Sequence, residues 1–376
     1  MRSSALHTWT RRPQSALAAL LILAVSGCGA TGRHDPRRER RARGAPVART
    51  SAPSEAIAAR APGAGSPPSS PPPPRRAFVT AQTEDRILEV ELPSGRVVGQ
   101  TAVPGDPEYV AATGGSLIAV SARGGTVSIL NPRSLHLIRR LRGFSSPHIP
   151  AIAPGGDYAY VTDDAAGDVT TIGLSDDRIV SRVRVGSGAH HLAFSPDRRQ
   201  IWIALGQSAA SIVILSTIVA TPPAPSSPVM DVGHPHVVGR FAPGFLAHDL
   251  LFTPDGRQVW ITSADTSDVG VFSSRDHRLL FRVPAGPPPQ HVAFDGGFAY
   301  ITSGYGSQIE QVSVATGRVV RRAPAPYGSF DLDAVGPDVV TASLFRGTLA
   351  IYNGRLRRLR VRPLAPSTED VAIMTR

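Results

Sequence analysis

The chain has 376 residues, enough for one large domain or two smaller ones. Its 36 glycines and 35 prolines are typical of an all-β protein with many turns, of a chain with a disordered tract, or of both. The formal net charge is +11, but residues 1–76 carry +10 of it and residues 77–376 only +1. Because a protein that follows a phosphate backbone needs a concentrated basic surface, this distribution argues against nucleic acid as a partner.

The N-terminus has the layout of an export signal. A basic front is followed by an apolar run over residues 15–25 that is too short to span a bilayer. The next residues, Val25-Ser-Gly-Cys28, resemble the lipobox of bacterial lipoproteins, and Cys28 is the only cysteine of the chain. The resemblance implies that residues 1–27 are a lipoprotein signal peptide and that Cys28 is lipidated. It predicts an extracytoplasmic protein anchored to the bacterial membrane, with an ordinary secretory signal or a twin-arginine signal as alternatives.

Residues 28–76 are predicted to be a disordered tether. They are rich in Arg, Pro, Ser, Ala and Gly, and they end in a proline run that favours extended polyproline II. The arginine cluster at residues 37–43 either rests on anionic lipid or belongs to a soluble spacer. With Cys28 lipidated, no cysteine is left for a disulfide, so the folded part must be stabilised by its core alone.

From Ala77 onward the chain repeats itself. A short strand with an aliphatic or aromatic centre recurs seven times, mostly at intervals of about 40 residues, and it is followed by two further strands and preceded by one. The copies of this marker strand begin at Ala77, Leu117, Tyr158, Gln200, Gln258, Phe298 and Val339. Four short strands per repeat are typical of a propeller blade. We therefore predict an all-β fold, a seven-bladed β-propeller of four-stranded blades over residues 77–376.

The repeat motifs resemble those of a known family. Tyr160-Val-Thr-Asp, Tyr300-Ile-Thr-Ser, Ser195-Pro-Asp and Thr253-Pro-Asp-Gly look like the YVTN repeats of bacterial surface β-propeller proteins. The resemblance covers roughly residues 77–376 and implies the propeller fold, but it names no ligand.

Two segments interrupt the regular order. The chain enters at a marker strand, and its last eight residues, from Glu369 to Arg376, resemble the strand that precedes each marker. The C-terminus is therefore predicted to supply the innermost strand of the first blade and to close the ring. A proline-rich insertion, residues 216–235, is expected between the third and fourth strands of the fourth blade, as a tolerated insertion or as a partner-binding loop.

Five of the 11 histidines fall in the segments that lead into the predicted innermost strands. Aligning these segments gives two variable columns. The first column reads Glu108, His148, His190, His248, Gln290, Phe330 and Glu369, and the second reads Tyr109, Ile149, His191, Asp249, His291, Asp331 and Asp370. In a propeller, equivalent positions from all blades converge at one mouth of the central channel. An arc of imidazoles is thus expected beside an arc of carboxylates.

We predict a ligand-binding site at this mouth. It comprises Glu108, His148, His190, His191, His248, Asp249, Gln290, His291 and Glu369. His148, His190 and His248 come from consecutive blades and are candidate ligands of a divalent metal such as zinc, copper or nickel. The alternatives are acid–base chemistry, a ring that only bonds loop carbonyls, and, for His191, packing between blades.

Other residues are expected around this site. The connections that open on the same face carry Glu84, Asp85, Arg123, Asp163, Asp164, Asp265, Tyr305, Phe345 and Arg346. A second histidine pair, His234 and His236, is expected on the opposite face.

The catalytic motifs of common hydrolases, metalloproteases and phosphate-binding enzymes are missing from the sequence, so no catalytic residue is assigned. The sequence thus predicts a monomeric, lipid-anchored propeller that binds an unidentified small molecule or protein at its channel mouth. The alternatives are a metal-dependent propeller enzyme of the lactonase or lyase kind, with its site at the central axis, and a structural envelope protein.

Overall fold

The two ends of the repeat array meet in one sheet. The computed structural model describes residues 75–206, 210–219, 229–286 and 288–374. Strand β30 (Val371–Ile373) pairs antiparallel with β1 (Arg75–Ala81), with Ala77 opposite Ile373. The backbone amide of Met374 also donates to the Arg76 carbonyl oxygen at 2.8 Å. The prediction that the C-terminal segment closes the ring is therefore confirmed.

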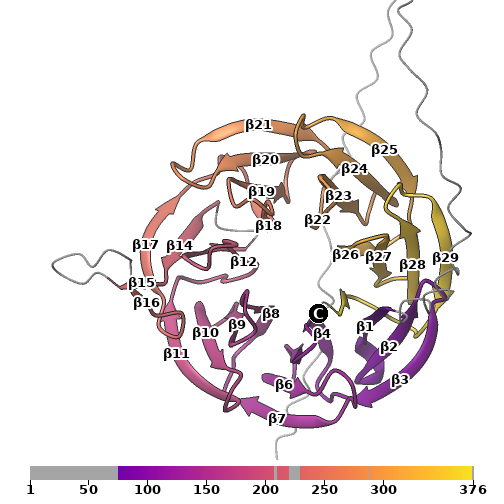
Figure 1. Cartoon of the computed structure of the whole chain (residues 1–376), viewed down its shortest axis with the longest axis horizontal. Coiled ribbons are helices and arrows are strands. Elements are labelled where there is room, and N and C mark those ends of the chain that lie inside the picture. Colours follow the sequence, from indigo (N-terminus) through magenta and orange to yellow (C-terminus); the bar gives the residue numbers. More distant parts are fainter. Residues whose placement is uncertain (1–74, 207–209, 220–228, 287, 375–376) are drawn as a thin grey trace, which may run out of the picture. The chain divides into compact units, whose positions relative to one another are not determined.

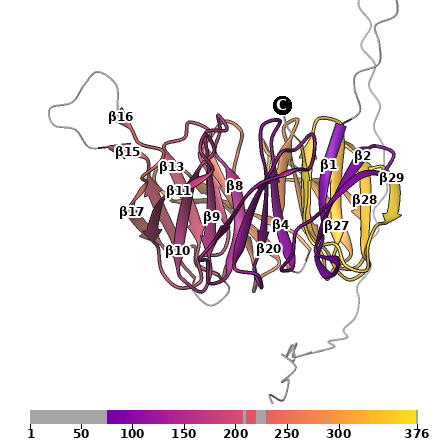
Figure 2. The ribbon, with the colours of Figure 1, turned by 90° about the horizontal axis from the view of Figure 1, so that it is seen from below.

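The described residues form seven four-stranded antiparallel sheets around a central axis, as Figure 1 shows, and Figure 2 presents the ring from the side. The predicted seven-bladed β-propeller is thus the observed fold. Each blade is named here by its order along the chain, starting from the blade that contains β1, and its strands are given from the axis outward.

Blade one contains β30, β1, β2 (Arg86–Leu92) and β3 (Arg96–Ala102), with the short 3-10 helix η1 (Gln82–Glu84) between β1 and β2. Blade two contains β4 (Pro107–Ala112), β5 (Leu117–Ser121), β6 (Thr126–Leu130) and β7 (Leu137–Arg142). Blade three contains β8 (Pro147–Ile152), β9 (Tyr158–Asp163), β10 (Asp168–Gly173) and β11 (Arg178–Arg184). Blade four contains β12 (Leu192–Phe194), β13 (Gln200–Ala204), β14 (Ile212–Ser216) and β17 (His236–Phe241).

Blade five contains β18 (Ala247–Phe252), β19 (Gln258–Ser263), β20 (Asp268–Ser273) and β21 (Leu279–Pro284). Blade six contains β22 (Val292–Asp295), β23 (Phe298–Ser303), β24 (Gln308–Ser313) and β25 (Val319–Pro324). Blade seven contains β26 (Ser329–Val335), β27 (Asp338–Ser343), β28 (Thr348–Asn353) and β29 (Arg358–Pro363).

The core lies between the blades. The second strands are buried on both faces, as β5 and β27 show over their whole length, because each blade is covered by its two neighbours. Ile118 and Val120 of blade two, for example, pack with Val161 of blade three. Full burial of such a side chain contributes about 1.5–3 kcal/mol. The repetition seen in the sequence is therefore the repetition of one interface around a ring.

The insertion lies where it is expected, between the third and fourth strands of blade four. It forms a two-stranded sheet from β15 (Ile218–Val219) and β16 (Val229–Met230), which lies at the periphery in Figure 1. Its last part packs on blade three, because the Ser181 hydroxyl donates to the Gly233 carbonyl oxygen at 2.7 Å and the Tyr160 hydroxyl donates to the Val232 carbonyl oxygen.

The predicted signal peptide (residues 1–27), the lipidation site Cys28 and the predicted tether lie outside the described residues, except that β1 already begins at Arg75, before the expected start at Ala77. Among the residues that the structure describes, no helix is long and apolar enough to cross a bilayer.

Candidate functional site

The residues of both columns are fixed in place by threonines of the second strands. The Thr162 hydroxyl accepts a hydrogen bond from the Ile149 amide of its own blade at 3.0 Å and donates to the His190 carbonyl oxygen of the next blade at 2.6 Å. Thr262 connects the Asp249 amide and the Gln290 carbonyl oxygen in the same way, at 2.9 and 2.7 Å. Each threonine thus couples the mouth positions of two successive blades. The repeated threonine of the marker strands was the sequence signal for this role.

The second column lines the central channel. A cavity of about 150 Å³ on the axis is bordered by Tyr109, Ile149, His191, Asp249, His291, Asp331 and Asp370, with Pro150, Leu192, Leu250, Leu251, Val292 and Leu332 as apolar neighbours. All seven second-column residues therefore face one space, including His191, for which packing between blades was the alternative. That alternative is wrong, since His191 lies among the other imidazoles.

The two columns bring five imidazoles into one cluster, which we call the histidine cluster: His148, His190, His191, His248 and His291. The rings of His148 and His190 stack with centroids 3.8 Å apart and an interplanar angle of 20°. His191 occupies the centre, with its ring centroid 4.7 Å from that of His190 and 4.8 Å from those of His248 and His291.

Several ring nitrogens of this cluster are buried without a partner. Neither nitrogen of His191, which is only 2% exposed, has a hydrogen bond, and the same holds for Nε2 of His148 and Nδ1 of His248. Burial, reinforced by the neighbouring imidazoles, lowers the pKa of His148, His191 and His248 well below the usual value. These rings are therefore neutral at physiological pH, and their free lone pairs are available to a ligand.

His190 is oriented by a carboxylate. Its Nδ1 lies 3.3 Å from Oδ2 of Asp164. A proton on Nδ1 that is donated to Asp164 leaves the lone pair on Nε2, which is the arrangement in which a carboxylate supports a metal-binding histidine.

His291 differs from the other four histidines. Its Nε2 lies 2.9 Å from Asp331 and its Nδ1 lies 3.7 Å from Asp249. Burial alone lowers the pKa of His291, but the charges of Asp331 and Asp249 outweigh it and raise the pKa to about 9. His291 is therefore an imidazolium with both nitrogens engaged, which makes it a poor metal ligand and a fixed positive charge beneath the neutral rings.

Two groups of three histidines have ligand atoms within 4.8 Å of one another: His148 with His190 and His191, and His191 with His248 and His291. Both groups include His191, whereas the set expected from the sequence, His148, His190 and His248, omits it. The difference arises because the second column reaches the same space as the first. In the second group Nε2 of His291 is already held by Asp331 at 2.9 Å, so we favour His148, His190 and His191, with His248 beside them.

The other side of the mouth carries carboxyl groups whose pKa values are raised. Burial, with Asp331 and Glu108 adding their charges, raises the pKa of Glu369 to about 9, and burial beside Asp106 raises the pKa of Glu108. One oxygen of Glu369 is buried without a partner. Gln290, also predicted for the site, is buried, and its carbonyl oxygen is the one held by Thr262.

An aromatic group adjoins the acidic side. The ring of Phe330, a first-column residue, lies 5.0 Å from Tyr305 and 5.4 Å from Phe345, and Tyr327 packs 5.2 Å from Phe345. Tyr305, Tyr327 and Phe345 are exposed. Tyr327 was not singled out from the sequence, because it lies in a blade-to-blade connection that has no repeated pattern.

Most aspartates of the expected face have structural partners instead of a free carboxylate. Asp163 accepts the amides of Ser145 and Ser146 at 2.7 and 2.9 Å. Asp85 holds the amide of Asp106 at 2.8 Å. These carboxylates shape the loops between blades, and Asp164, which orients His190, is the one that serves the cluster.

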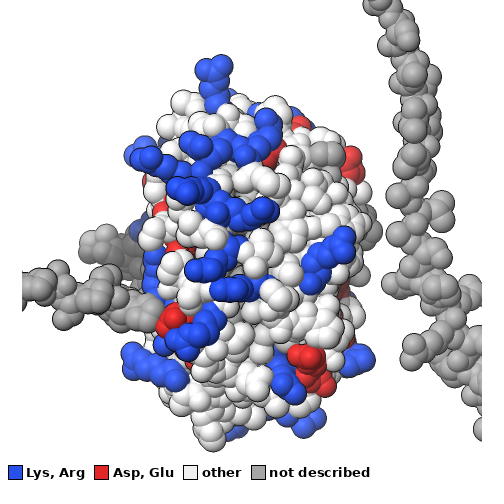
Figure 3. All heavy atoms as spheres, turned by 90° about the vertical axis from the view of Figure 1, so that its right-hand side faces the viewer, with Lys and Arg blue, Asp and Glu red and all other residues white. Residues whose placement is uncertain are grey.

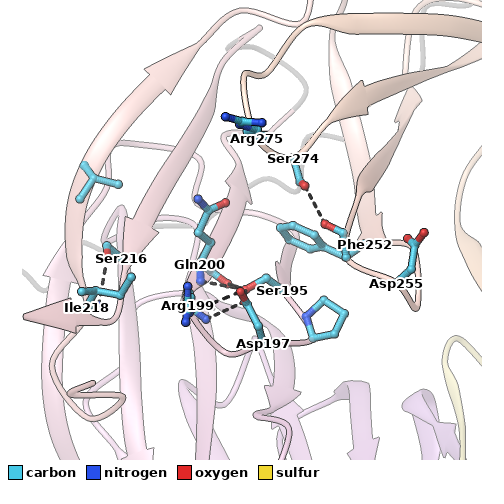
Figure 4. Close-up of a pocket in the computed structure, with 13 residues that line it drawn as sticks. Ser195, Asp197, Arg199, Gln200, Ser216, Ile218, Phe252, Asp255, Ser274 and Arg275 are labelled. Carbon is cyan, nitrogen blue, oxygen red and sulfur yellow. Dashed lines mark hydrogen bonds and ion pairs between the residues drawn. The ribbon is translucent and has the colours of Figure 1, made fainter. Parts of the chain in front are cut away.

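The face of the propeller opposite the histidine cluster has fewer features of a binding site. His234 pairs with Asp231 at 3.0 Å on the surface. A hollow of about 480 Å³ lies between blades four and five, and Figure 4 shows the residues that line it. Its hydroxyls are already used within the protein, since Ser195 donates to Asp197 and Ser274 donates to the Gly256 carbonyl oxygen, both at 2.6 Å. No ligand is indicated there.

Comparisons with known proteins agree with the fold. No protein-family model and no curated protein sequence matches the chain. Among solved structures, hydrazine synthase of Kuenenia stuttgartiensis is similar, with 17% identity and a TM-score of 0.64 over 74% of this chain and 92% of that one. A functionally unknown protein from Desulfotomaculum acetoxidans has 15% identity and a TM-score of 0.65 over 80% and 99% of the two chains. Apo AztD from Citrobacter koseri has 10% identity and a TM-score of 0.62 over 80% and 97%. At these identities the likeness concerns the fold alone.

Proposed function

We propose that this propeller binds a transition metal ion through the imidazoles of His148, His190, His191 and His248. The observation that carries the proposal is the fully buried His191, whose two nitrogens lack partners at the centre of a histidine cluster. A buried polar group without a partner costs about 1–3 kcal/mol. A metal bound to one nitrogen of His191 would satisfy that nitrogen and offset part of that cost.

The donor set selects the kind of metal. An all-imidazole site suits zinc, copper or nickel, whereas calcium and magnesium prefer oxygen ligands. Zinc–nitrogen bonds of about 2.0–2.1 Å place the ligand nitrogens of a tetrahedral site roughly 3.3 Å apart. The ligand atoms of His148, His190 and His191, which lie within 4.8 Å of one another, would have to move closer together, and the stacked rings of His148 and His190 would have to turn toward the ion.

We further propose that the protein is an exported, monomeric, YVTN-type surface propeller, anchored to the membrane through lipidated Cys28, and that its mouth is a binding module. The lipobox-like segment and the repeat motifs of the sequence support this placement.

The metal site is tested on the full chain carrying Cys28→Ser, which removes the one thiol. Titration with Zn²⁺, Cu²⁺ or Ni²⁺ by calorimetry, with metal analysis after dialysis, is expected to give one ion per chain. The triple variant His148→Gln, His190→Gln and His191→Gln is expected to lose it. The matched control changes the exposed His136, His234 and His236 to Gln and should retain the ion. Absence of bound metal, or equal retention by the two triple variants, would overturn the proposal.

A further inference from the structure

The arginines of the propeller are segregated on its outer wall. Every outermost strand carries arginine, and none carries an aspartate or a glutamate. Residues 77–376 are nearly neutral in sum, but their outermost strands carry arginines without acidic residues.

Eight exposed arginines lie on blades six and seven. We call this surface the basic wall, which consists of Arg318, Arg321, Arg322, Arg355, Arg357, Arg358, Arg360 and Arg362. All eight side chains are exposed, and Figure 3 shows a band of basic side chains across this side of the ring. The acidic residues between positions 311 and 368 are Asp331, Asp333 and Asp338, and none of them is exposed.

Few of these charges are neutralised within the protein. Among the described residues, Arg322 pairs with Glu310 at 2.7 Å, and the other seven arginines of the basic wall form no ion pair. On blades three and five Arg182 and Arg282 pair with Asp168 and Asp268, whereas the three arginines of β7 on blade two, like most of the basic wall, form no ion pair among the described residues. The basic wall therefore offers unneutralised charge to a partner.

Protection of the sheet edge does not require all of these arginines. Charged side chains on an edge strand prevent pairing with other chains, and the outermost strands carry from one arginine, as in β17 and β21, to three, in β7, β11 and β29. On blades six and seven the turns before β25 and β29 add Arg318, Arg355 and Arg357, which lie outside the edge strands.

Aliphatic side chains lie between the arginines. Val320 is 51% exposed and Leu359 is 42% exposed, and Val361 is exposed beside them. Arginine interleaved with aliphatic residues is suited to a surface that combines negative charge with an apolar layer beneath it, as a bilayer interface does.

The chain that leads to the predicted lipid anchor enters the ring beside blade seven, next to its two inner strands β26 and β27. Arg75, the first residue of β1, donates to the Val335 carbonyl oxygen at 2.6 Å and pairs with Asp338 at 2.8 Å, both in blade seven. Cys28 precedes Arg75 by fewer than fifty residues.

We propose that the basic wall docks on an anionic lipid bilayer. The choice of lipid as the partner rests on the proposed lipid anchoring, and it is independent of the metal site. The arginines bind the lipid headgroups, and Val320, Leu359 and Val361 contact the interface between them. The wall would then hold the ring edge-on, with both channel mouths open to solvent.

The test uses the full chain with Cys28→Ser, so that no lipid is attached, and vesicles of phosphatidylcholine with or without phosphatidylglycerol. The wall variant carries Arg321→Gln, Arg358→Gln and Arg360→Gln. Its matched control carries Arg139→Gln, Arg142→Gln and Arg178→Gln, from the outer strands of blades two and three. Both variants keep residues 1–74, so any binding by that segment cancels in the comparison.

We expect binding that requires phosphatidylglycerol and weakens with salt. The wall variant should bind roughly a hundredfold more weakly than the control, since each basic residue near such a surface adds about 1 kcal/mol. Equal binding by the two variants would overturn the proposal, as would a preference for DNA or RNA over the vesicles at the same ionic strength. Because the metal titration of the wall variant should be unchanged, failure here is distinguishable from failure of the metal site.

Discussion

The carboxylate of Asp370 accepts a hydrogen bond from the backbone amide of Val110 at 2.8 Å, across the boundary between blades one and two. Its other oxygen accepts the amide of Val371 at 2.7 Å. Asp249 makes the same pair of contacts, with the amide of Val292 in the next blade at 3.0 Å and with its own neighbour Leu250. Buried aspartates thus join the innermost strands of successive blades.

Replacing Asp370 by Asn should therefore destabilise the ring. The amide group of Asn offers only one acceptor oxygen, so one buried backbone amide loses its partner, at a cost of about 1–3 kcal/mol. The measurement is the free energy of unfolding in urea. Asp276→Asn, at an exposed turn, is the control and should change it little. If both variants unfold alike, the bridging role of Asp370 is wrong.

Removal of the last eight residues should be more severe. It deletes β30, in which Val371, Ala372 and Ile373 are buried, and it exposes the inner edge of β1. The two larger side chains alone contribute about 1.5–3 kcal/mol each, a large part of a typical stability of 5–15 kcal/mol. We expect loss of a cooperative melting transition, measured by calorimetry. A chain shortened only by residues 375 and 376 is the control. If the chain that lacks all eight residues melts at the same temperature as this control, the closure of the ring by β30 is contradicted.

The contribution of Glu369 to the stability of the protein should fall as the pH rises. The pKa of Glu369 is raised from 4.5 to about 9, so the folded state holds this proton more tightly than the unfolded state. The resulting stabilisation is complete below the unfolded value and is lost as the pH rises through about 9.

Glu369→Gln removes this dependence, because the amide stays neutral. At about pH 8 the variant should be more stable than the parent, by roughly 5 kcal/mol at about 1.4 kcal/mol for each pH unit above the unfolded pKa, and at about pH 4 the two should be equal. The measurement is the melting temperature across the pH range, with a variant at an exposed position, Glu84→Gln, as control. If the melting temperatures of the parent and of Glu369→Gln change with pH in the same way, the proposed role of the Glu369 proton is refuted.

Thr162→Val should weaken the fold and the metal site together. The substitution keeps the shape but removes the bonds to the Ile149 amide and the His190 carbonyl oxygen. We expect a loss of about 1–3 kcal/mol in unfolding free energy, and weaker metal binding because His190 is no longer anchored. Thr316→Val, on an exposed turn, tests whether the effect is specific to this network. Unchanged metal affinity in Thr162→Val would show that the hydrogen bonds of Thr162 do not position the metal ligands.

The repeats of the sequence were sufficient to predict the fold and its closure. Each blade repeats the same alternation of a buried marker strand and an arginine-bearing outer strand, so one alignment determines the register of the ring. The same alignment brought the seven residues of the second column together, although they are far apart in the chain.

The distances across the axis were not predictable. His191 and His190 are adjacent in the chain, and alternation along a strand would point them apart. They instead precede β12, where the backbone is not yet extended into the sheet, and both rings enter the cluster. The ionisation of His291 was equally hidden, because it depends on Asp331 and Asp249 from two other blades.

The pairing of residue 77 with residue 373 also constrains when the protein can be completed. A chain made from its N-terminus contains three strands of blade one long before the strand that covers their inner edge. Closing a loop over nearly the whole repeat array carries an entropic cost, and such contacts form late. Until synthesis ends, β1 presents an unpaired edge, so it is the segment of a nascent chain most exposed to pairing with the wrong partner.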